Sequence, residues 1–487
     1  MNKTFGEKEL EEICSKLQFS DSSFIPHSLS FRSPVHVVYG GAHLFRADTP
    51  NKLGKIALQS LEIYAPNFVE FARAMWLKGA DALPVYNAPI ADLQMLLTEN
   101  AEAVKAENFE AWLAWLVYRR TIEKLWREPI EDYRIDFEDG YGFRLDAEED
   151  LHAISASDEL AKAFLSRTIT TFCGFRIKSL QVETYQRAIR TLDLFLTNLF
   201  EKTGGKLPEN FVVTLPKIRR KEEVEVLEEL LTRFEKQGNL ENGCIKIEIM
   251  IETPQSIVDE TGEIALRKLV EAGKGRVTSA HFGAFDYTAS LAIAGVHQHL
   301  RHEACNFARQ MMQIALAPLN IRLCDSVTIE IPVAVCKGED LTKEQRKENF
   351  RVVHNAWRKH FNNVTYSLIN GFYQSWDLHP AQLAARYAAV YSFFLESKDE
   401  QGKRLKSFIE KATQANLTGN TFDDEASANG LLNFFAHGLS CGALSEKEIT
   451  EAAGLTIEEL MAASFAKVLE SRNKSNQHFT GKQIASG

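Results

Sequence analysis

Long apolar runs without charge are missing from this chain of 487 residues. A helix needs about 18 or more such residues to cross a membrane, and no stretch of that kind occurs. The first residues, 1–14, also have no apolar core of the signal-peptide type. We therefore expect a soluble, cytoplasmic protein without a membrane partner.

Paired cysteines are absent too. No two of the seven cysteines are spaced as CxxC, and an odd number cannot all be bridged within the chain. This usage is typical of a reducing compartment. The seven are Cys14, Cys173, Cys244, Cys305, Cys324, Cys336 and Cys441.

An excess of basic residues is also lacking. The chain has 56 Lys and Arg against 66 Asp and Glu, a formal net charge of −10. No basic face is evident, which argues against nucleic acid as a main partner. No glycine-rich loop of the GxGxxG or P-loop type follows a predicted strand, which disfavours a nucleotide site. The apolar fraction of 45% and the charged fraction of 25% are those of an ordinary globular protein.

The chain does have a regular alternation of β-like and helical segments. The first strand is 34–39, and seven further strands are centred near Ile135, Phe175, Val213, Ile249, Phe282, Ile329 and Ser367. Amphipathic helical segments lie between them at 183–202, 221–236, 256–272, 300–317 and 342–360. This alternation is typical of a parallel sheet. Eight strands favour a (β/α)₈ TIM barrel over an open doubly wound sheet.

The domain organisation follows from where strands are missing. We expect an N-terminal segment, 1–33, with a short helix at 6–17, and a barrel over 34–395. A helical insertion at about 46–132, with helices at 53–64, 67–78 and 91–128, follows the first strand. A C-terminal helical extension covers 396–487. Helices are predicted at 381–397, 404–415, 424–437 and 445–471, and the first of them starts within the barrel range. Ser445 and Thr456 resemble helix caps. We expect a frayed end from 472.

Charged residues follow the predicted strands. Side chains at the carboxyl ends of barrel strands face the active-site mouth. Glu252 and Asp286 end two apolar runs, 245–254 and 277–291, on neighbouring strands. Two carboxylates there predict a site for a hard cation such as Mg²⁺. Other strand ends deliver Glu138, Asp139, Arg176, Lys217, Asp377 and His379.

Each of these residues also has a structural interpretation. Glu138 and Asp139 can cap the next helix or pair with Arg144, and Arg176 can neutralise a neighbouring acid. Lys217 can extend from its strand end to water. His379 precedes Pro380, a helix-start pattern that favours a structural role for His379. An aromatic stripe with Trp112, Trp115 and Trp126 is interpreted as core.

Six segments together resemble a known family. In chain order they read IDFEDGY, FRIK, TLPK, IETP, FGAFDYTASL and DLHPAQ. They are similar to the signature segments of the citrate lyase β-subunit-like aldolases, TIM barrels related to malate synthase and the 2-oxo-acid aldolases. The resemblance covers about 34–395. It implies a carbon–carbon lyase that uses Mg²⁺, or Mn²⁺, to break or form a bond beside a carboxylate, often with a CoA thioester.

The resemblance also implies roles for matching residues. Glu252 and Asp286 become the metal ligands, and Arg176 becomes the cation that faces the carbonyl or enolate oxygen of the substrate. Glu138 and Asp139 match an acidic pair near the metal. They, or an ordered water, are the candidates for proton transfer.

The substrate that this implies is a 2-oxo acid or an acyl-CoA, turned over through a metal-stabilised enolate. We expect backbone amides near Gly40, Gly41 and Gly283, with Lys217, to bind its carboxylate. The long insertion and the C-terminal helices are larger than simple family members need, which leaves the use of CoA open. Asp377 is a candidate for the catalytic aspartate of malate synthase by position alone.

Two alternatives remain open. A metal-free aldolase would form a Schiff base on Lys217 or Lys178. A non-catalytic barrel would use its helical extensions to bind partners. A homo-oligomer is compatible with all of these functions.

Overall fold

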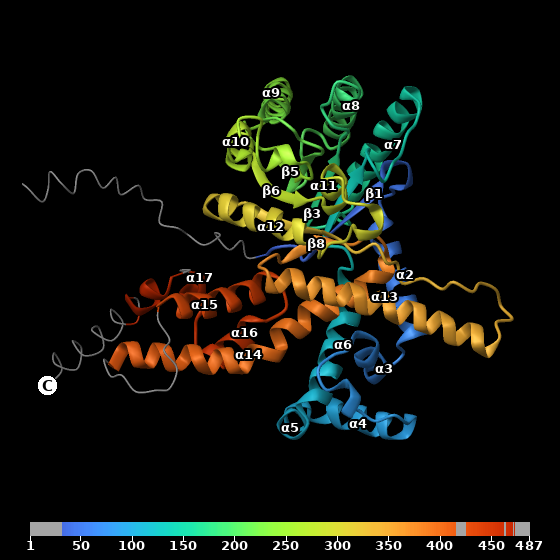
Figure 1. Ribbon diagram of the computed structural model, residues 1–487, viewed down its shortest axis with the longest axis vertical. Coiled ribbons are helices and arrows are strands. Elements are labelled where there is room, and N and C mark those ends of the chain that lie inside the picture. The colour runs from blue at the N-terminus through green and yellow to red at the C-terminus, as the bar shows by residue number, and fades with distance from the viewer. Residues whose placement is uncertain (1–31, 415–424, 462–463, 471, 473–487) are drawn as a thin grey trace, which may run out of the picture.

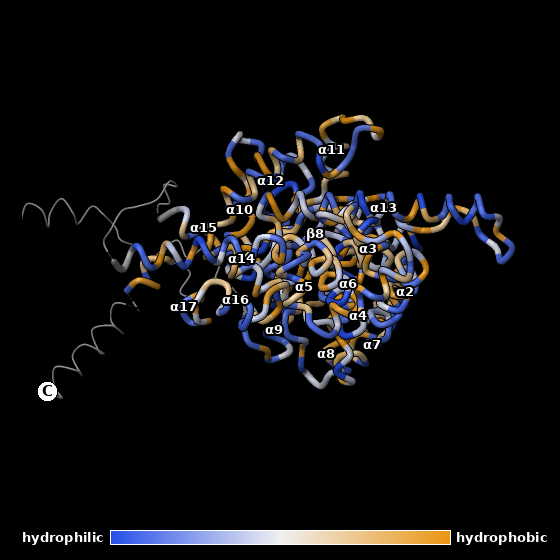
Figure 2. The backbone as a smooth tube through the Cα atoms, turned by 90° about the horizontal axis from the view of Figure 1, so that it is seen from below, coloured by the Kyte–Doolittle hydropathy of each residue, from blue (hydrophilic) through white to orange (hydrophobic). Residues whose placement is uncertain are grey.

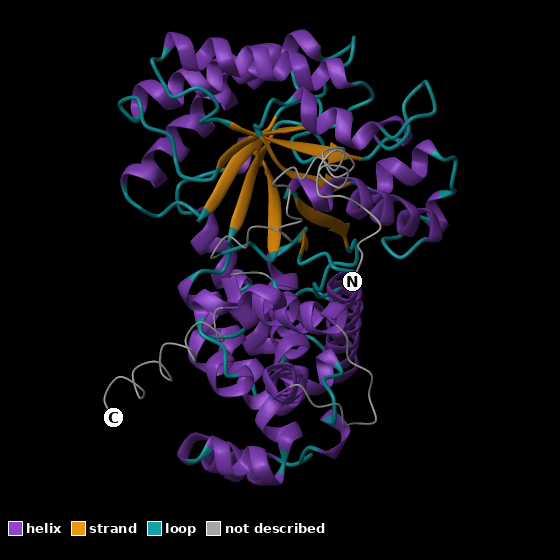
Figure 3. Cartoon of the chain, turned by 90° about the vertical axis from the view of Figure 1, so that its left-hand side faces the viewer, coloured by secondary structure: helices purple, strands orange, loops and turns teal. Residues whose placement is uncertain are grey.

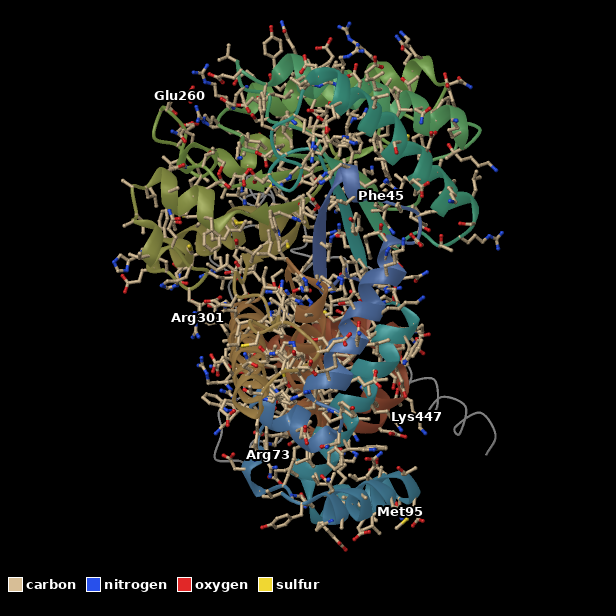
Figure 4. The ribbon with its side chains drawn as sticks, turned by 90° about the vertical axis from the view of Figure 1, so that its right-hand side faces the viewer. Phe45, Arg73, Met95, Glu260, Arg301 and Lys447 are labelled. Carbon is tan, nitrogen blue, oxygen red and sulfur yellow. The ribbon has the colours of Figure 1, made fainter. Side chains whose placement is uncertain are left out.

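The computed structural model describes residues 32–414, 425–461, 464–470 and 472. The predicted helix at 6–17 and nearly all of the predicted frayed end lie outside this range. Two regions make up the molecule, a strand barrel ringed by helices and a block of helices beneath it (Figure 1, Figure 3). Phe45 lies beside the barrel, and Met95 lies at the far end of the helical block (Figure 4).

Eight parallel strands close into a barrel in chain order, with β1 paired to β8. This confirms the predicted (β/α)₈ fold. The strands are β1 (His36–Gly41), β2 (Asp132–Asp136), β3 (Phe172–Arg176), β4 (Phe211–Leu215), β5 (Lys246–Ile251), β6 (Val277–Phe282), β7 (Arg322–Val327) and β8 (Gln374–Trp376).

The last two strands differ from the prediction. β7 ends before Ile329, and Ser367 lies inside helix α13 (Lys343–Ile369) instead of in β8. The β-branched residues around Ser367 suggested a strand, but Val364 and Leu368 are buried four residues apart, which is the spacing of one helix face. Packing of that face therefore overrides the local β propensity.

Helices cover the outside of the barrel. They are α7 (Asp146–Leu165), α8 (Tyr185–Lys202), α9 (Lys221–Gln237), α10 (Ala265–Ala272), α11 (Ala284–Ser290), α12 (Glu303–Leu316) and α13. Outward strand residues pack against them: Phe175 of β3 stacks on Phe195 of α8 with 4.1 Å between ring centroids. Helix α10 begins later than predicted because a bridge joins Val258 to Ile264 ahead of it. The first turns of α13 extend from the body and are mostly hydrophilic (Figure 2).

The helical insertion after β1 is present. It consists of α2 (Thr49–Tyr64), α3 (Phe68–Met75), α4 (Asn87–Glu99), α5 (Ala101–Glu107) and α6 (Phe109–Arg127). Asn67, Asn100 and Asn108 begin α3, α5 and α6 by accepting backbone hydrogen bonds in the first turn. Trp112 is buried in the core as predicted, whereas Trp126 is 71% exposed.

The C-terminal helical extension is present as well. It contains α14 (Leu383–Gln414), α15 (Glu425–Ser440), α16 (Glu446–Ala453) and α17 (Ile457–Met461). α14 is one continuous helix where two were predicted, and it packs on α6 and α13. Ser445 and Thr456 accept the hydrogen bonds expected of caps. Short 3₁₀ helices complete the fold at η1 (Ala42–Leu44), η2 (Ala80–Ala82), η3 (Pro254–Ser256), η4 (Gly295–His297), η5 (Ala317–Leu319) and η6 (Pro380–Gln382).

Two expectations from composition can be compared with the described residues. Within them, no helix combines the length and the apolar character that a membrane span requires. The six cysteines in the described ranges are free thiols, and Cys14 lies outside those ranges.

The barrel interior is charged, whereas most TIM barrels fill it with branched aliphatic side chains. Arg134 of β2 binds Asp132 and also donates to Glu248 of β5, with 2.7 Å between Nη2 and Oε2. Glu248 also accepts from the Tyr39 hydroxyl at 3.0 Å. Burial would raise the pKa of Glu248, but Arg134 and His281 overcome this and hold that pKa well below its usual value. Pairing is what makes charge tolerable in this core.

Candidate active site

Six residues singled out in the sequence gather at the carboxyl end of the barrel. The parallel strands explain this, because each residue follows its strand at the same rim. The six are Glu138 and Asp139 after β2, Arg176 at the end of β3, Lys217 after β4, Glu252 after β5, and Asp286 in the first turn of α11.

Arg176 is held by an aspartate that the sequence analysis missed. Asp136, the last residue of β2, accepts from Arg176 Nε at 2.7 Å and from Nη2 at 2.6 Å. Asp136 also accepts from the backbone amides of Glu138 and Gly140, at 3.0 and 2.7 Å. Such a two-point contact fixes the plane of the guanidinium. The signal was the spacing: Asp136 precedes Glu138 by two residues and so points into the barrel.

The other sides of Arg176 are also occupied. Its guanidinium carbon lies 4.8 Å from the ring centroid of Tyr39 and 5.9 Å from that of Trp376, and these rings stack on each other. Nη1 lies 3.1 Å from Glu138 Oε2 and 3.4 Å from Asp139 Oδ2. Arg176 is thus a buried, fully oriented cation.

Lys217 crosses the rim. Its φ of 52° is left-handed, a strained conformation for a residue with a side chain. Its Nζ binds Glu138, lies 2.9 Å from Asp139 Oδ1, and is 3.8 Å from Asp286 Oδ1. Its backbone amide donates to Glu252 Oε1 at 2.6 Å. Lys217 therefore contacts four carboxyl groups, those of Glu138, Asp139, Glu252 and Asp286.

Glu252 is almost completely buried, at 1% exposure. Burial, followed by the charge of Asp286, raises the pKa of Glu252 to about 8. Within the described residues, Oε2 accepts no hydrogen bond, because the only bond to this carboxyl group is at Oε1. A Cβ on Gly283 would lie 2.5 Å from Oε2. Because residue 283 is glycine, Glu252 Oε2 has room at this position, which a larger side chain would fill.

The remaining acids differ in exposure. The side chain of Asp286 is 43% exposed, and burial raises its pKa although Lys217 opposes the shift. Burial raises the pKa of Glu138 to about 7, although Arg176 lowers it. Burial would also raise the pKa of Asp139, but Glu138, Arg176 and Lys217 lower it below its usual value.

The charge balance of this rim suits a divalent cation. Five carboxyl groups, those of Asp136, Glu138, Asp139, Glu252 and Asp286, stand against two cations, Arg176 and Lys217. Among the described residues, no three His, Cys, Asp or Glu side chains form a cage for a metal. Mg²⁺ does not need one, because it is commonly held by one or two carboxylates with substrate and water.

Two predicted glycines have clear packing roles. A Cβ on Gly40 would lie 1.9 Å from the hydroxyl of Tyr133, and one on Gly41 would lie 2.4 Å from the carbonyl oxygen of Gly140. Both positions need glycine for close approach. Their contact with a substrate stays a prediction, as does that of Gly283.

Residues after β8 do not join the rim cluster. Asp377 is buried against α13 and α14, where Arg386 Nη2 and His360 Nε2 each lie 2.8 Å away. Burial would raise the pKa of Asp377, but Arg386 and His360 hold it well below its usual value. His379 Nδ1 accepts from the amide of Ala381 at 3.1 Å and caps η6, which is the structural role its sequence favoured.

Arg144 and Lys178, both named in the sequence analysis, bind partners outside the rim cluster. Arg144 pairs with Glu148 at 2.6 Å, so the predicted alternative of a pair with Glu138 or Asp139 is not formed. Lys178 Nζ donates to the Phe137 carbonyl at 2.6 Å and to Glu149 at 2.8 Å. The Lys178 amine is therefore bound to groups close to the ends of the barrel strands.

Comparisons with solved structures give similar folds at low identity. A citrate lyase from Burkholderia xenovorans LB400 is 17% identical, with a TM-score of 0.49 over 69% of this chain and 92% of that chain. Malate synthase from Haloferax volcanii in a magnesium and glyoxylate complex is 15% identical, with a TM-score of 0.36 over 72% and 84%. The pyruvate and acetyl-CoA ternary complex of the same enzyme is 15% identical, with a TM-score of 0.38 over 68% of this chain and 89% of that chain. These are the kinds of enzyme that the sequence resemblance names, but likeness at this level does not transfer an activity.

Comparison with curated proteins gives no match. One family model matches residues 19–468, under the description "Domain of unknown function (DUF6986)". That match spans the barrel, the insertion and most of the C-terminal helices. The chain therefore belongs to the DUF6986 family.

Proposed function

We propose that this protein is a Mg²⁺-dependent carbon–carbon lyase or aldolase that acts on a 2-oxo acid. The observation that carries the proposal is the rim cluster, in which carboxyl groups outnumber cations around one buried, oriented arginine. An acyl-CoA as second substrate and Mn²⁺ as an alternative ion belong to the same proposal.

Glu252 and Asp286 would hold the ion. Glu252 offers an oxygen without a hydrogen bond from the described residues, and Asp286 offers a partly exposed carboxylate that interacts with it. When bound, the ion would supply Lewis-acid polarisation of a carbonyl group. Asp286 also lies 3.8 Å from Lys217 Nζ, so Lys217 would shift toward Glu138 and Asp139 as the ion binds.

Arg176 would bind the oxygen that gains negative charge during cleavage or condensation. Asp136 fixes two of its nitrogens, and Tyr39 lies against its face. A preorganised cation of this kind stabilises developing charge without reorientation. The substrate oxygen would take the place of Glu138 and Asp139 at Nη1, the one nitrogen that Asp136 does not bind.

Glu138 is the best-placed group for proton transfer. Its pKa of about 7 lets it gain and lose a proton near neutral pH, as general acid and base catalysis requires. It contacts Arg176 and Lys217 at once, so its proton would be released close to the reacting oxygen. Asp139, whose pKa is lowered, would remain the charged partner of Lys217.

The Schiff-base alternative is less well supported. A Schiff base forms from a neutral amine. Burial would lower the pKa of Lys217, but Glu138 and Asp139 raise it well above its usual value. Borohydride treatment with pyruvate should therefore leave the protein unmodified, and a trapped adduct on Lys217 would support the metal-free mechanism.

Titration calorimetry with MgCl₂ and pyruvate, glyoxylate or oxaloacetate tests the proposal. Mg²⁺ should bind to the wild type and not to Glu252→Gln, and a 2-oxo acid should bind more tightly when Mg²⁺ is present. Arg233→Gln, a change on the exposed face of α9, is the matched control. Activity that persists in EDTA would contradict the proposal. Absence of both ion and 2-oxo-acid binding would favour a non-catalytic barrel.

A further inference from the structure

A cavity lies at the opposite end of the barrel from the rim cluster. It has a volume of about 320 Å³ and is bounded by the first residues of β6, β7 and β8. Its lining includes Thr278, Arg322, Leu323, Tyr373 and Gln374. This volume is within the range of sites that take small molecules.

Arg322, the first residue of β7, is half-buried and borders this cavity. In the described part of the chain it makes no ion pair, and its Nε is enclosed without a hydrogen-bond partner. Its guanidinium carbon lies 4.9 Å from the ring centroid of Phe172. Burial lowers the pKa of the guanidinium, and the charges of Asp132 and Glu248 oppose this shift without reversing it.

Every fully buried arginine among the described residues is bound to a carboxylate. Arg134 pairs with Glu248, Arg176 with Asp136, Arg276 with Glu235, Arg309 with Asp325 and Arg386 with Asp377. The barrel thus supplies acids for its arginines as a rule. Arg322 is less buried, makes no such pair, and borders the cavity.

Gln374 supplies a second polar atom without a partner. The side chain is 3% exposed, and its Nε2 donates to Asp132 Oδ2 at 3.0 Å and to the His36 carbonyl at 3.3 Å. These two bonds fix the amide, and its Oε1 is left enclosed without a donor. Cys324, two residues after Arg322, is paired in register with Gln374, so both groups border one end of two adjacent strands.

We propose that this cavity is a second binding site, specific for a small hydroxy-carboxylate. Arg322 would bind the carboxylate, and Gln374 Oε1 would accept a hydrogen bond from the hydroxyl group. A buried donor and a buried acceptor both need partners, and a hydroxy acid supplies the two together. Leu323 and Val277 provide the apolar wall against its carbon chain. The site is independent of the proposed activity, because it shares no lining residue with the rim cluster.

Titration calorimetry on the full chain in EDTA tests the site, with L-malate, succinate and inorganic phosphate as probes at constant ionic strength. L-malate should bind, and succinate, which lacks the hydroxyl, should bind about tenfold more weakly, as loss of one hydrogen bond to a buried group predicts. Equal affinities for the three probes would overturn the hydroxy-carboxylate assignment. No binding of any probe would overturn the site.

Arg322→Met is the decisive variant. It should abolish L-malate binding and should not lower the melting temperature in ligand-free buffer, because the half-buried guanidinium makes no ion pair with the described residues. L-malate binding that survives in Arg322→Met and disappears in Arg176→Met would place the ligand at the rim and contradict the proposal. A lower melting temperature for ligand-free Arg322→Met would show that Arg322 has a partner after all.

Arg276→Met serves as the matched control. Arg276 is more deeply buried, at 2% exposure, and pairs with Glu235 at 2.7 Å. Its removal should lower the melting temperature and leave the affinity for L-malate unchanged. Arg322→Lys, which keeps the charge without the planar fork, should weaken L-malate binding without abolishing it.

Discussion

The two ends of the barrel hold opposite imbalances of charge. At the carboxyl ends of the strands, carboxyl groups outnumber Arg176 and Lys217. At the other end Arg322 makes no ion pair with the described residues. Between them, Arg134 and Glu248 are paired. The comparison indicates that charge in this barrel is compensated where it only supports the fold, and is left uncompensated where a ligand of opposite charge is expected.

The largest expected effect is on turnover at the acidic end. Glu252→Gln keeps the shape of the side chain and removes the charge that would face the ion. We expect turnover to fall by about 10³-fold or more, since metal polarisation supplies several kcal/mol of transition-state stabilisation. A coupled assay for release or consumption of the 2-oxo acid measures this. Wild-type turnover in EDTA should fall equally, and any difference between the two losses would weaken the comparison.

The next effect concerns the compensated middle of the barrel. Arg134→Met would leave Asp132 and Glu248 buried without their main cation. We expect the free energy of unfolding to fall by about 3–5 kcal/mol, as for other broken buried pairs. Urea denaturation followed by circular dichroism measures the loss. Arg322→Met is the control, and an equal loss in that variant would contradict the contrast between paired and unpaired arginines.

A smaller effect concerns pH. In the folded protein Glu252 keeps its proton up to about pH 8, whereas an unfolded glutamate releases it near about pH 4.3. The raised pKa means that stability from this group is greatest in acid and declines as pH rises from about 4.3 to 8. At pH 7 without metal, Glu252→Gln should therefore be more stable than the wild type by about 3–4 kcal/mol. Melting curves at pH 5 and pH 7 test this, and a gain that is larger at pH 5 would contradict it.

The smallest predicted effect concerns Gly283. In Gly283→Ala the new Cβ would lie 2.5 Å from Glu252 Oε2, so Glu252 must move. We expect Mg²⁺ affinity to fall by about tenfold and the free energy of unfolding to fall by about 1–3 kcal/mol, because the new Cβ would also lie 2.6 Å from the Cβ of Glu252. Titration calorimetry measures the affinity. Gly295→Ala, at a position with open space around it and no positive φ, is the control for adding a methyl group.

The alternation of strands and helices in the sequence was enough to predict the barrel and the positions of most rim residues. A parallel barrel places the residue after each strand at one rim, so Glu138, Arg176, Lys217 and Glu252 could be placed from strand ends alone. The eighth strand failed because Ser367 lies among β-branched residues whose burial is helical.

Other features depend on distant partners, which no local pattern identifies. Asp136 was visible as a strand residue, but its bond to Arg176 depends on the pairing of β2 with β3. The pKa of Glu138 depends on how deeply the fold buries it. The lack of a partner at Arg322 is a property of everything around it, and no sequence window contains that information.

The charged barrel interior restricts how this family can diversify. An aliphatic core accepts one substitution at a time when volume is kept, but a change at Arg134, Asp132 or Glu248 leaves a partner stranded in the core. Substitutions at these interior positions must therefore occur in coordinated pairs. Single substitutions are tolerated more easily in the loops beyond the strands, where new specificities would arise first.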